Sequence, residues 1–281
     1  MINILLTGGD IRTVYAAAAL SDDFRCALYG FDKLDGSARY GIPLYDGTMI
    51  PDCVVLPVNR SGSTIKCPFG SKPEITPDEL PVSRKNAVIA EGSRTPEIEE
   101  YCRKHGFLHT AVLEDEALAV ANAQLTAEGA LAAAVNGTQT SVHGANVLVL
   151  GFGRIAKLCA RYFAALGAHV TCAARKPADL AWADAMGCGT ADFADEAAML
   201  GALESSDIIL NTVPAPILTG ERARRVPSHT VLIELASIPC TEENTDIRVI
   251  KANGLPGKTA PASAGRYIAG TVRRILTERG N

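Results

Sequence analysis

One stretch constrains the fold more than any other, because it places a glycine turn between a buried strand and a helix. The apolar run Val147 to Leu150 predicts a parallel strand, and apolar residues at helical spacing from Ile155 to Leu166 predict the helix. Gly151, Gly153 and the small Ala156 together complete Gly-x-Gly-x-x-Ala, which lets backbone N–H groups approach a pyrophosphate. We therefore expect a dinucleotide site rather than a structural glycine turn, formed by Gly151, Gly153, Arg154 and Ile155.

The second strand of this unit, over residues 168–175, indicates which dinucleotide is bound. Folds that select NAD usually carry an acidic residue roughly 20 residues after the glycines, where it binds the ribose 2′-hydroxyl. This strand instead ends in Ala174, Arg175 and Lys176. Two cations without a carboxylate favour a 2′-phosphate, so we expect NADP, with NAD as the alternative. The other interpretation of Arg175 and Lys176 is a solvated strand end.

Two later strands bring further segments to the same edge of the sheet. The predicted strands 207–211 and 230–234 end in Asn-Thr-Val-Pro and Glu-Leu-Ala-Ser, and a strand over 247–250 with helices over 180–186 and 194–204 completes a doubly wound sheet. A proline that stops a strand after Asn and Thr is typical of the nicotinamide-ribose side of such domains, although a plain turn explains it too. We therefore add to the cofactor site Asn211, Thr212, Val213, Pro214, Ala236 and Ser237.

The first part of the chain also alternates strands with helices. Strands are expected over 2–6, 25–29, 53–56, 87–90 and 108–113, with helices over 11–20 and 97–105. The fold class is therefore α/β, with two doubly wound parallel-sheet (Rossmann-like) domains and a cleft between them. The expected domains are an N-terminal α/β substrate domain (1–115), linking helices (116–140), an NAD(P)-binding domain (141–255) and a C-terminal helix that returns to the N-terminal domain (256–281).

Composition excludes several classes of function. The chain has 281 residues, 47% of them hydrophobic, and a net charge of -4. This net charge does not indicate the basic surface that nucleic-acid binding needs. We see no apolar run long enough for a membrane span and no signal peptide. We therefore expect a cytoplasmic protein. The eight cysteines and five histidines lack metal-ligand spacing, so we expect no metal and reduced, structural thiols. We also expect a homo-oligomer.

Three further segments are candidates for ligand contacts. Thr7-Gly-Gly-Asp10 resembles a second phosphate loop, but lacks the third glycine position and fits a tight turn better. The proline-rich loop 57–86 leaves the carboxyl end of a strand, so its polar residues can bind a carboxylate there or simply form a solvated loop. These residues are Arg60, Ser61, Ser63, Thr64 and Lys66.

Glu128 lies between the predicted domains. We expect helices over 114–123 and 126–135, the second of which carries Glu128 toward the substrate. The alternative is that Thr126 caps this helix and Glu128 merely favours its first turn. His143 either takes part in catalysis or begins the cofactor-domain strand as a structural residue.

The ordered combination of motifs along essentially the whole chain resembles one family, the A subunit of dipicolinate synthase from bacterial spore formation. The residues that carry this resemblance are Thr7-Gly-Gly-Asp-x-Arg12, Gly30-Phe-Asp32, Leu56-Pro57, Glu128-Gly129, Val142-His-Gly144, Gly151-Phe-Gly-Arg154, Phe163-Ala-Ala-Leu-Gly-Ala168, Ala174-Arg175, Asn211-Thr-Val-Pro214, Leu235-Ala-Ser237, Gly254-Leu-Pro-Gly257 and Thr259-Ala-Pro261.

The resemblance implies oxidation of dihydrodipicolinate to dipicolinate with a nicotinamide cofactor. It also implies a flavoprotein-like partner, the B subunit of dipicolinate synthase, and action in the cytoplasm of the mother cell during sporulation. Such chemistry needs cations for two carboxylates and an acceptor for one proton. The candidate cations are Arg12, Arg60 and Lys258, and the candidate acceptors are Glu128 first and His143 second.

Two other functions remain open from the sequence. An NADP-dependent enzyme of the alanine or hydroxyacid dehydrogenase type shares the two domains and normally pairs a His with a carboxylate or Lys. A non-catalytic nucleotide-binding subunit would bind cofactor without turnover until its partner is added.

Overall fold

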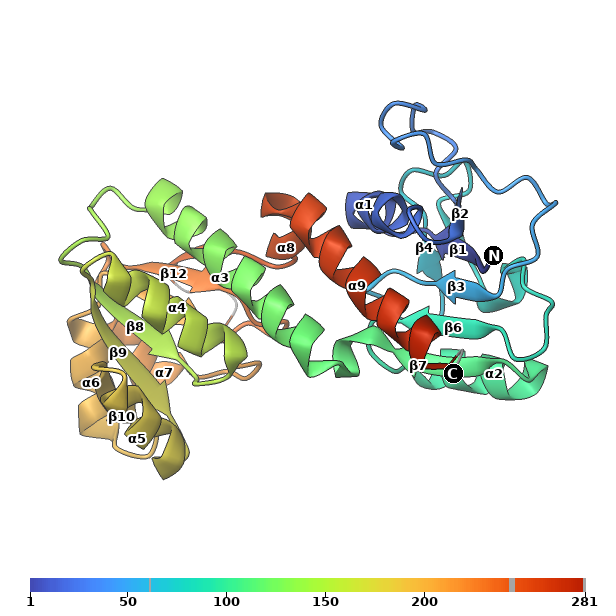
Figure 1. Cartoon of the computed structure of the whole chain (residues 1–281). Helices are drawn as coiled ribbons and strands as arrows, with labels where there is room; N and C mark the ends of the chain where they lie inside the picture. Colours follow the sequence, from blue (N-terminus) through green and yellow to red (C-terminus); the bar gives the residue numbers. More distant parts are fainter. Residues whose placement is uncertain (61, 243–245, 280–281) are drawn as a thin grey trace. The chain divides into compact units, whose positions relative to one another are not determined.

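The chain forms two compact units in a computed structural model that describes residues 1–60, 62–242 and 246–279. Unit 1 contains residues 1–122 together with the chain from residue 260 onward, and unit 2 contains Ala123–Thr259. Each unit has its own parallel sheet, flanked by helices (Figure 1). The expected α/β class with two Rossmann-like sheets is confirmed.

Unit 1 is built on a five-stranded parallel sheet in the order β2-β1-β3-β6-β7. Its strands are short apolar runs, and successive side chains enter opposite faces of the sheet. Ile4 and Leu6 therefore pack under one helical layer, while Leu5 packs under the other. The strands are β1 (Asn3–Thr7), β2 (Arg25–Tyr29), β3 (Cys53–Val55), β6 (Val88–Glu91) and β7 (Leu108–Ala111).

Helices α1 (Ile11–Leu20) and α9 (Pro261–Arg279) cover one face of this sheet and lie side by side (Figure 1). Gly265 of α9 permits the close approach, because a Cβ there would come within 2.4 Å of Tyr15 Cβ. Helix α2 (Pro96–His105) covers the other face. Unit 1 also contains the 3-10 helices η1 (Pro77–Glu79) and η2 (Val112–Glu114).

The loop 57–86 contains a hairpin that the sequence pattern did not predict. Strands β4 (Ile65–Lys66) and β5 (Glu74–Ile75) pair antiparallel, and Ile65, Cys67 and Ile75 join the hydrophobic core beneath α2. Each strand has only two residues, which is too short for an alternating pattern to be recognisable.

Unit 2 carries a six-stranded parallel sheet in the order β10-β9-β8-β11-β12-β13. The strands are β8 (Asn146–Leu150), β9 (His169–Ala174), β10 (Gly189–Asp192), β11 (Ile208–Asn211), β12 (Val231–Glu234) and β13 (Arg248–Lys251). On one face pack α4 (Arg154–Ala165), α5 (Pro177–Ala185) and the part of α3 (Glu116–Gly137) that lies in unit 2, and on the other packs α6 (Glu196–Glu204). The short helices α7 (Gly220–Arg225) and α8 (Leu255–Thr259) complete the unit.

Helix α3 differs in two respects from what the sequence predicted. It is one continuous helix rather than two, so Thr126 is a buried residue in its interior and not an N-cap. Among the described residues it is the one helix long and apolar enough to cross a membrane, whereas the sequence analysis had found no apolar run of that length. Half of the most apolar 18-residue stretch of this helix is buried inside the protein. Ala127, Ala130 and Ala134 lie in the core of unit 2, so it is a core helix.

Candidate functional site

The glycine turn of unit 2 begins where β8 ends. Gly151 has a φ of 100°, a conformation that favours glycine, and its N–H donates to Ala173 O of β9 at 2.8 Å. A Cβ at Gly151 would lie 2.5 Å from Thr212 Oγ1 and 2.8 Å from Val213 Cγ2. The turn is therefore packed directly against the segment that follows β11, and the structure brings these two predicted parts of the cofactor site together.

The amino-terminus of α4 is open. Its N-cap is Gly153, no side chain caps the helix, and its first turn contains no acidic residue. No atom lies within 4 Å of a Cβ built on Gly153, whereas Ala156 is fully buried against the sheet. Backbone N–H groups at such a terminus, together with the helix dipole, form a site for a phosphate. The residues present therefore fit the pyrophosphate of a dinucleotide.

Arg175 and Lys176 follow β9 directly and are both exposed. Their side chains make no hydrogen bond or ion pair with any residue that the structure describes. No acidic residue stands between Ala174 and the start of α5 at Pro177. This corner therefore offers two free cations near the place where the ribose 2′ position of a dinucleotide lies.

In the segment after β11, the polar side chains make hydrogen bonds within the protein. Asn211 is fully buried, and its amide donates to Val213 O (3.0 Å) and to Glu234 Oε1 (2.6 Å) while its oxygen accepts from Val213 N (3.0 Å). Thr212 Oγ1 donates to Leu150 O at 2.8 Å. These side chains shape the turn itself, so their polar groups are already used within the protein.

Glu234, the last residue of β12, makes hydrogen bonds with the segment that follows this strand at the carboxyl edge of the sheet. Its buried carboxylate accepts from Ala236 N (3.2 Å) and Cys240 N (2.9 Å) as well as from Asn211. Ala236 is buried as a result, whereas Ser237 and Pro214 are exposed. The edge thus offers Val213, Pro214 and Ser237 rather than Asn211 to a ligand.

In unit 1 the turn Thr7-Gly-Gly-Asp10 is filled by the protein. Gly9 N donates to Lys66 O of the β4-β5 hairpin at 2.7 Å, and a Cβ at Gly8 would lie 2.6 Å from the same oxygen. Asp10 caps α1 by accepting from Arg12 N at 3.0 Å. The structure therefore shows a tight turn whose space is filled by protein atoms, as the tight-turn interpretation expects.

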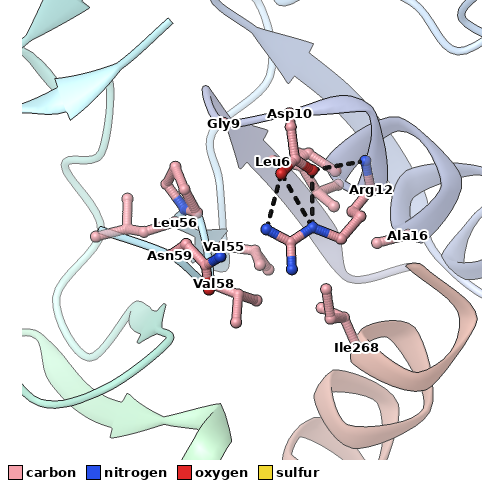
Figure 2. Close-up of a pocket in the computed structure, with 12 residues that line it drawn as sticks. Leu6, Gly9, Asp10, Arg12, Ala16, Val55, Leu56, Val58, Asn59 and Ile268 are labelled. Carbon is pink, nitrogen blue, oxygen red and sulfur yellow. Dashed lines mark hydrogen bonds and ion pairs between the residues drawn. The ribbon is translucent and has the colours of Figure 1, made fainter. Parts of the chain in front are cut away.

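Arg12 lies at the carboxyl edge of the five-stranded sheet, in a small cavity of about 30 Å³ (Figure 2). Its Nε and Nη2 donate to the Asp10 carboxylate at 2.8 and 2.7 Å, and its side chain is 6% exposed. Burial works against ionisation of Asp10, but the hydrogen bonds and charge of Arg12 hold the pKa of this carboxyl below its ordinary value. Nη1 of Arg12 has no partner among the described residues.

The guanidinium group of Arg60 is held by contacts within the protein. Nη2 lies 3.1 Å from Glu91 Oε2 and donates to Thr95 Oγ1, and Nη1 donates to Gly62 O at 2.7 Å. Nε is buried and has no partner within the described chain. Its neighbour Ser61 lies outside the described residues. Ser63 and Lys66 are exposed, and Thr64 Oγ1 donates to Glu74 Oε2 at 3.0 Å.

Three other predicted residues lie in unit 2. Glu128 is exposed on α3, 3.4 Å from Gln124 Nε2, while its neighbour Gly129 packs against Leu255 of α8. Lys258 is exposed on the short helix α8, which is separate from the C-terminal helix α9. His143 precedes β8 and packs on Gly167, at the amino edge of the sheet. It is therefore a strand length, roughly 15 Å, from the glycine turn.

A buried polar cluster in unit 1 was not predicted from the sequence. Glu91 ends β6, is fully buried, and lies 2.6 Å from His109 Nε2 of β7 and 2.9 Å from Thr95 N. The available signal was an acidic residue directly after an apolar strand, since a carboxylate in that position must find buried partners.

The cysteines offer no reactive thiol. All eight are free and buried, and burial raises the pKa of Cys26 and of Cys67 to about 11. Over residues 1–60, 62–242 and 246–279, no group of three His, Cys, Asp or Glu side chains is arranged to hold a metal.

Comparisons with known proteins assign the cofactor domain and the family. Residues 117–255 match the family described as D-isomer specific 2-hydroxyacid dehydrogenase, NAD binding domain. The chain is 30% identical to the A subunit of dipicolinate synthase of Bacillus subtilis (strain 168) over 99% of its own length and 96% of that protein. The crystal structure of the A subunit of dipicolinate synthase from Bacillus halodurans matches with a TM-score of 0.84 and 30% identity, over 98% of this chain and 97% of that one.

A more distant structure shares the fold alone. The transhydrogenase from Sinorhizobium meliloti matches with a TM-score of 0.71 at 14% identity, over 98% of this chain and 92% of that one.

Proposed function

Since the chain belongs to the family of the dipicolinate synthase A subunit, we propose that it oxidises dihydrodipicolinate to dipicolinate and transfers the hydride to NADP. The observation that carries this proposal is the near full-length relationship, joined to an open glycine turn with two free cations in a nicotinamide-cofactor domain. The partner would be the flavoprotein-like B subunit of the synthase, and the setting the cytoplasm of the mother cell during sporulation.

The reaction removes one hydride and one proton from a dihydropyridine ring and leaves an aromatic ring with both carboxylates intact. The nicotinamide ring supplies the hydride acceptor when the cofactor is bound. Because aromatisation is favourable, the protein needs mainly to position the substrate, to neutralise the carboxylates and to accept the proton.

The chain's own residues divide between these tasks. In unit 2, the N–H groups at the start of α4 would bind the pyrophosphate, and Arg175 and Lys176 the 2′-phosphate. In unit 1, Nη1 of Arg12 is the donor we assign to a substrate carboxylate. Lys258 is the second candidate cation.

Glu128 remains the proton acceptor that we propose. It is exposed and its nearest hydrogen-bond partner is the neutral amide of Gln124, so its carboxylate is available as a base. We do not propose His143 for this task, because it lies at the opposite edge of the sheet from the glycine turn.

One observation favours a second candidate, a dehydrogenase for simple 2-hydroxy or amino acids. Residues 117–255 match the cofactor domain of D-isomer-specific 2-hydroxyacid dehydrogenases. Such an enzyme would reduce a simple 2-keto acid with NADPH without help from any other protein.

The test is the change in reduced-nicotinamide absorbance when the purified chain, with and without the B subunit, receives NADP or NAD and freshly generated dihydrodipicolinate. We expect turnover with a preference for NADP. Tight NADPH binding without turnover in every combination would instead favour a non-catalytic nucleotide-binding role, and turnover of pyruvate by the chain alone would favour the second candidate.

A further inference from the structure

A short strap crosses the carboxyl edge of the unit 1 sheet. The strap, Pro57 to Arg60, leaves β3 and passes between two glycines. A Cβ at Gly9 would lie 2.9 Å from Pro57 Cβ, and one at Gly92 would lie 1.8 Å from Val58 O. The Pro57 ring therefore packs against the turn after β1, and the Val58 backbone packs against the turn after β6.

The strap forms one wall of the Arg12 cavity. Figure 2 shows Val58 and Asn59 across from the Arg12 guanidinium, whose other two nitrogens are taken by Asp10. The cavity has room for at least one water-sized group, such as a carboxylate oxygen, next to this guanidinium. A small displacement of the strap would open or close this space.

The far end of the strap is held by a buried cluster. The fully buried Glu91 carboxylate has four partners, which are His109 Nε2 (2.6 Å), Thr95 N (2.9 Å), Thr95 Oγ1 (2.8 Å) and Arg60 Nη2 (3.1 Å). Arg60 in turn binds the backbone of the strap's continuation at Gly62 O. Glu91 is thereby connected to the strap through one guanidinium.

Two guanidinium groups lie near this cluster. Arg94 Nη1 lies 3.3 Å from His109 Nδ1, and the other ring nitrogen, Nε2, faces Glu91. Arg94 is itself paired with Glu114 at 2.8 Å, which leaves Arg60 as the cation that neutralises Glu91. A buried ion pair of this kind contributes little net stability compared with apolar packing, and its best-attested use is to specify one arrangement.

We propose that Glu91 is a positioning residue for carboxylate recognition: through Arg60 it sets the strap that places Asn59 and Val58 opposite Arg12. This inference rests on the proposed function, because it assigns the Arg12 cavity to a substrate carboxylate. It gives Arg60 a role through the strap, in place of the direct contact with a substrate carboxylate that the sequence suggested.

The test compares Glu91→Gln with wild type by steady-state kinetics on dihydrodipicolinate, with the B subunit present, and by calorimetric titration with dipicolinate. We expect KM and the dipicolinate Kd each to rise about tenfold or more, because a charge-assisted hydrogen bond is lost. We expect kcat and the Kd of NADPH to change by less than about threefold, because the cofactor site is in unit 2.

Two further variants keep the test informative if Glu91→Gln folds poorly. Arg60→Lys keeps the buried charge pair but loses the bond to Gly62 O, and should raise KM while the protein stays folded. His109→Gln keeps an N–H donor for Glu91 and should leave KM close to wild type, whereas His109→Leu should raise it.

The matched control is Asp52→Asn. Asp52 lies at the opposite, amino-terminal end of β3, where its carboxylate accepts from Asn3 N at 2.9 Å and pairs with Arg84. This variant should lower the melting temperature and leave KM unchanged. If folded Glu91→Gln and Arg60→Lys also lower only the melting temperature, the cluster is merely structural and the inference is wrong. If the wild type neither turns over nor binds dipicolinate, the proposed function falls first and this inference with it.

Discussion

The two units contain the same strand-turn-helix arrangement, but only one of its turns is open. After β1, the Gly8-Gly9 turn is covered by the β4-β5 hairpin, and the amino-terminus of α1 is capped by the Asp10 carboxylate. After β8, the Gly151-Gly153 turn has no cap and no covering segment within 4 Å of the position where a side chain at Gly153 would begin. Whether a helix amino-terminus can bind an anion therefore depends on what already occupies it, and not on the glycines alone.

Although the Gly8-Gly9 turn is covered, the residues that follow it still present a charged group. The same Asp10 that satisfies α1 also orients Arg12, so unit 1 presents a cation where unit 2 presents free N–H groups. We therefore expect unit 1 to bind a carboxylate and unit 2 a dinucleotide.

The largest expected effect comes from giving unit 2 the cap that unit 1 has. Gly153→Asp fits the backbone, since φ is -78° there, and places a carboxylate over the first N–H groups of α4. We expect the Kd of NADPH to rise on the order of 100-fold, about 2.7 kcal/mol, in a fluorescence titration. The melting temperature should not fall, because Asp is a good N-cap. The uncharged cap of Gly153→Ser should have a smaller effect, and an unchanged Kd in Gly153→Asp would mean that the pyrophosphate binds elsewhere.

The next effect concerns the cations after β9. Arg175→Asp should weaken NADPH binding by about tenfold and strengthen NADH binding, because an acidic residue suits a ribose 2′-hydroxyl and repels a 2′-phosphate. Arg161→Asp, which makes the same charge change on the exposed side of α4, is the control. Equal losses in both variants would indicate a general charge effect rather than recognition of the 2′-phosphate.

A smaller effect is expected in the covered turn. Gly8→Ala must accept a φ of 58° and a contact of 2.6 Å with Lys66 O, whereas Gly41→Ala has a similar φ of 74° with no atom within 4 Å. Urea unfolding should therefore show Gly8→Ala to be less stable than Gly41→Ala by about 1–2 kcal/mol. NADPH affinity should be the same in both. A loss of NADPH affinity confined to Gly8→Ala would contradict the assignment of the nucleotide to unit 2 alone.

The smallest effect is a pH dependence. Because Arg12 lowers the pKa of Asp10 in the folded state, the ionised carboxylate stabilises the fold above its unfolded pKa of about 3.9, and this stability is lost as the pH falls through the folded pKa. The difference in unfolding free energy between wild type and Asp10→Asn should be under about 1 kcal/mol, since Asp10 is partly exposed, and should vanish in acid. Urea unfolding between neutral pH and about pH 3 measures it, and a difference independent of pH would show that the Arg12 contact is not responsible.

The sequence predicted most of the elements because apolar runs and glycine or proline punctuation agree with the tertiary structure. The failures have physical reasons. Strand β10, with the sequence Gly-Thr-Ala-Asp, lies at the edge of its sheet and is mostly exposed, so it needs no apolar run. Helix α3 is continuous through residues 124–126, where the sequence predicted a break, and Leu125 and Thr126 are buried there by tertiary packing that no local pattern reveals.

The residues of the candidate site are likewise of two kinds, those that a local sequence pattern reveals and those that depend on tertiary structure. The glycine turn and the cations Arg175 and Lys176 are local features of one strand-turn-helix unit, so they can be recognised from their spacing in the sequence. The Glu91 cluster joins Arg60, 31 residues away, to His109, 18 residues away, and such pairing depends on the strand order. The use of Asn211 within its own turn likewise depended on the buried neighbour Glu234.

The most direct test of the difference between the two turns is hydrogen exchange of the intact chain with and without saturating NADPH, resolved to short peptides. We predict slower exchange over residues 150–157 and 174–178, with no change over residues 7–14, because one turn is open and the other is already filled by the protein. Protection of residues 7–14, or binding that leaves 150–157 unprotected, would contradict this prediction.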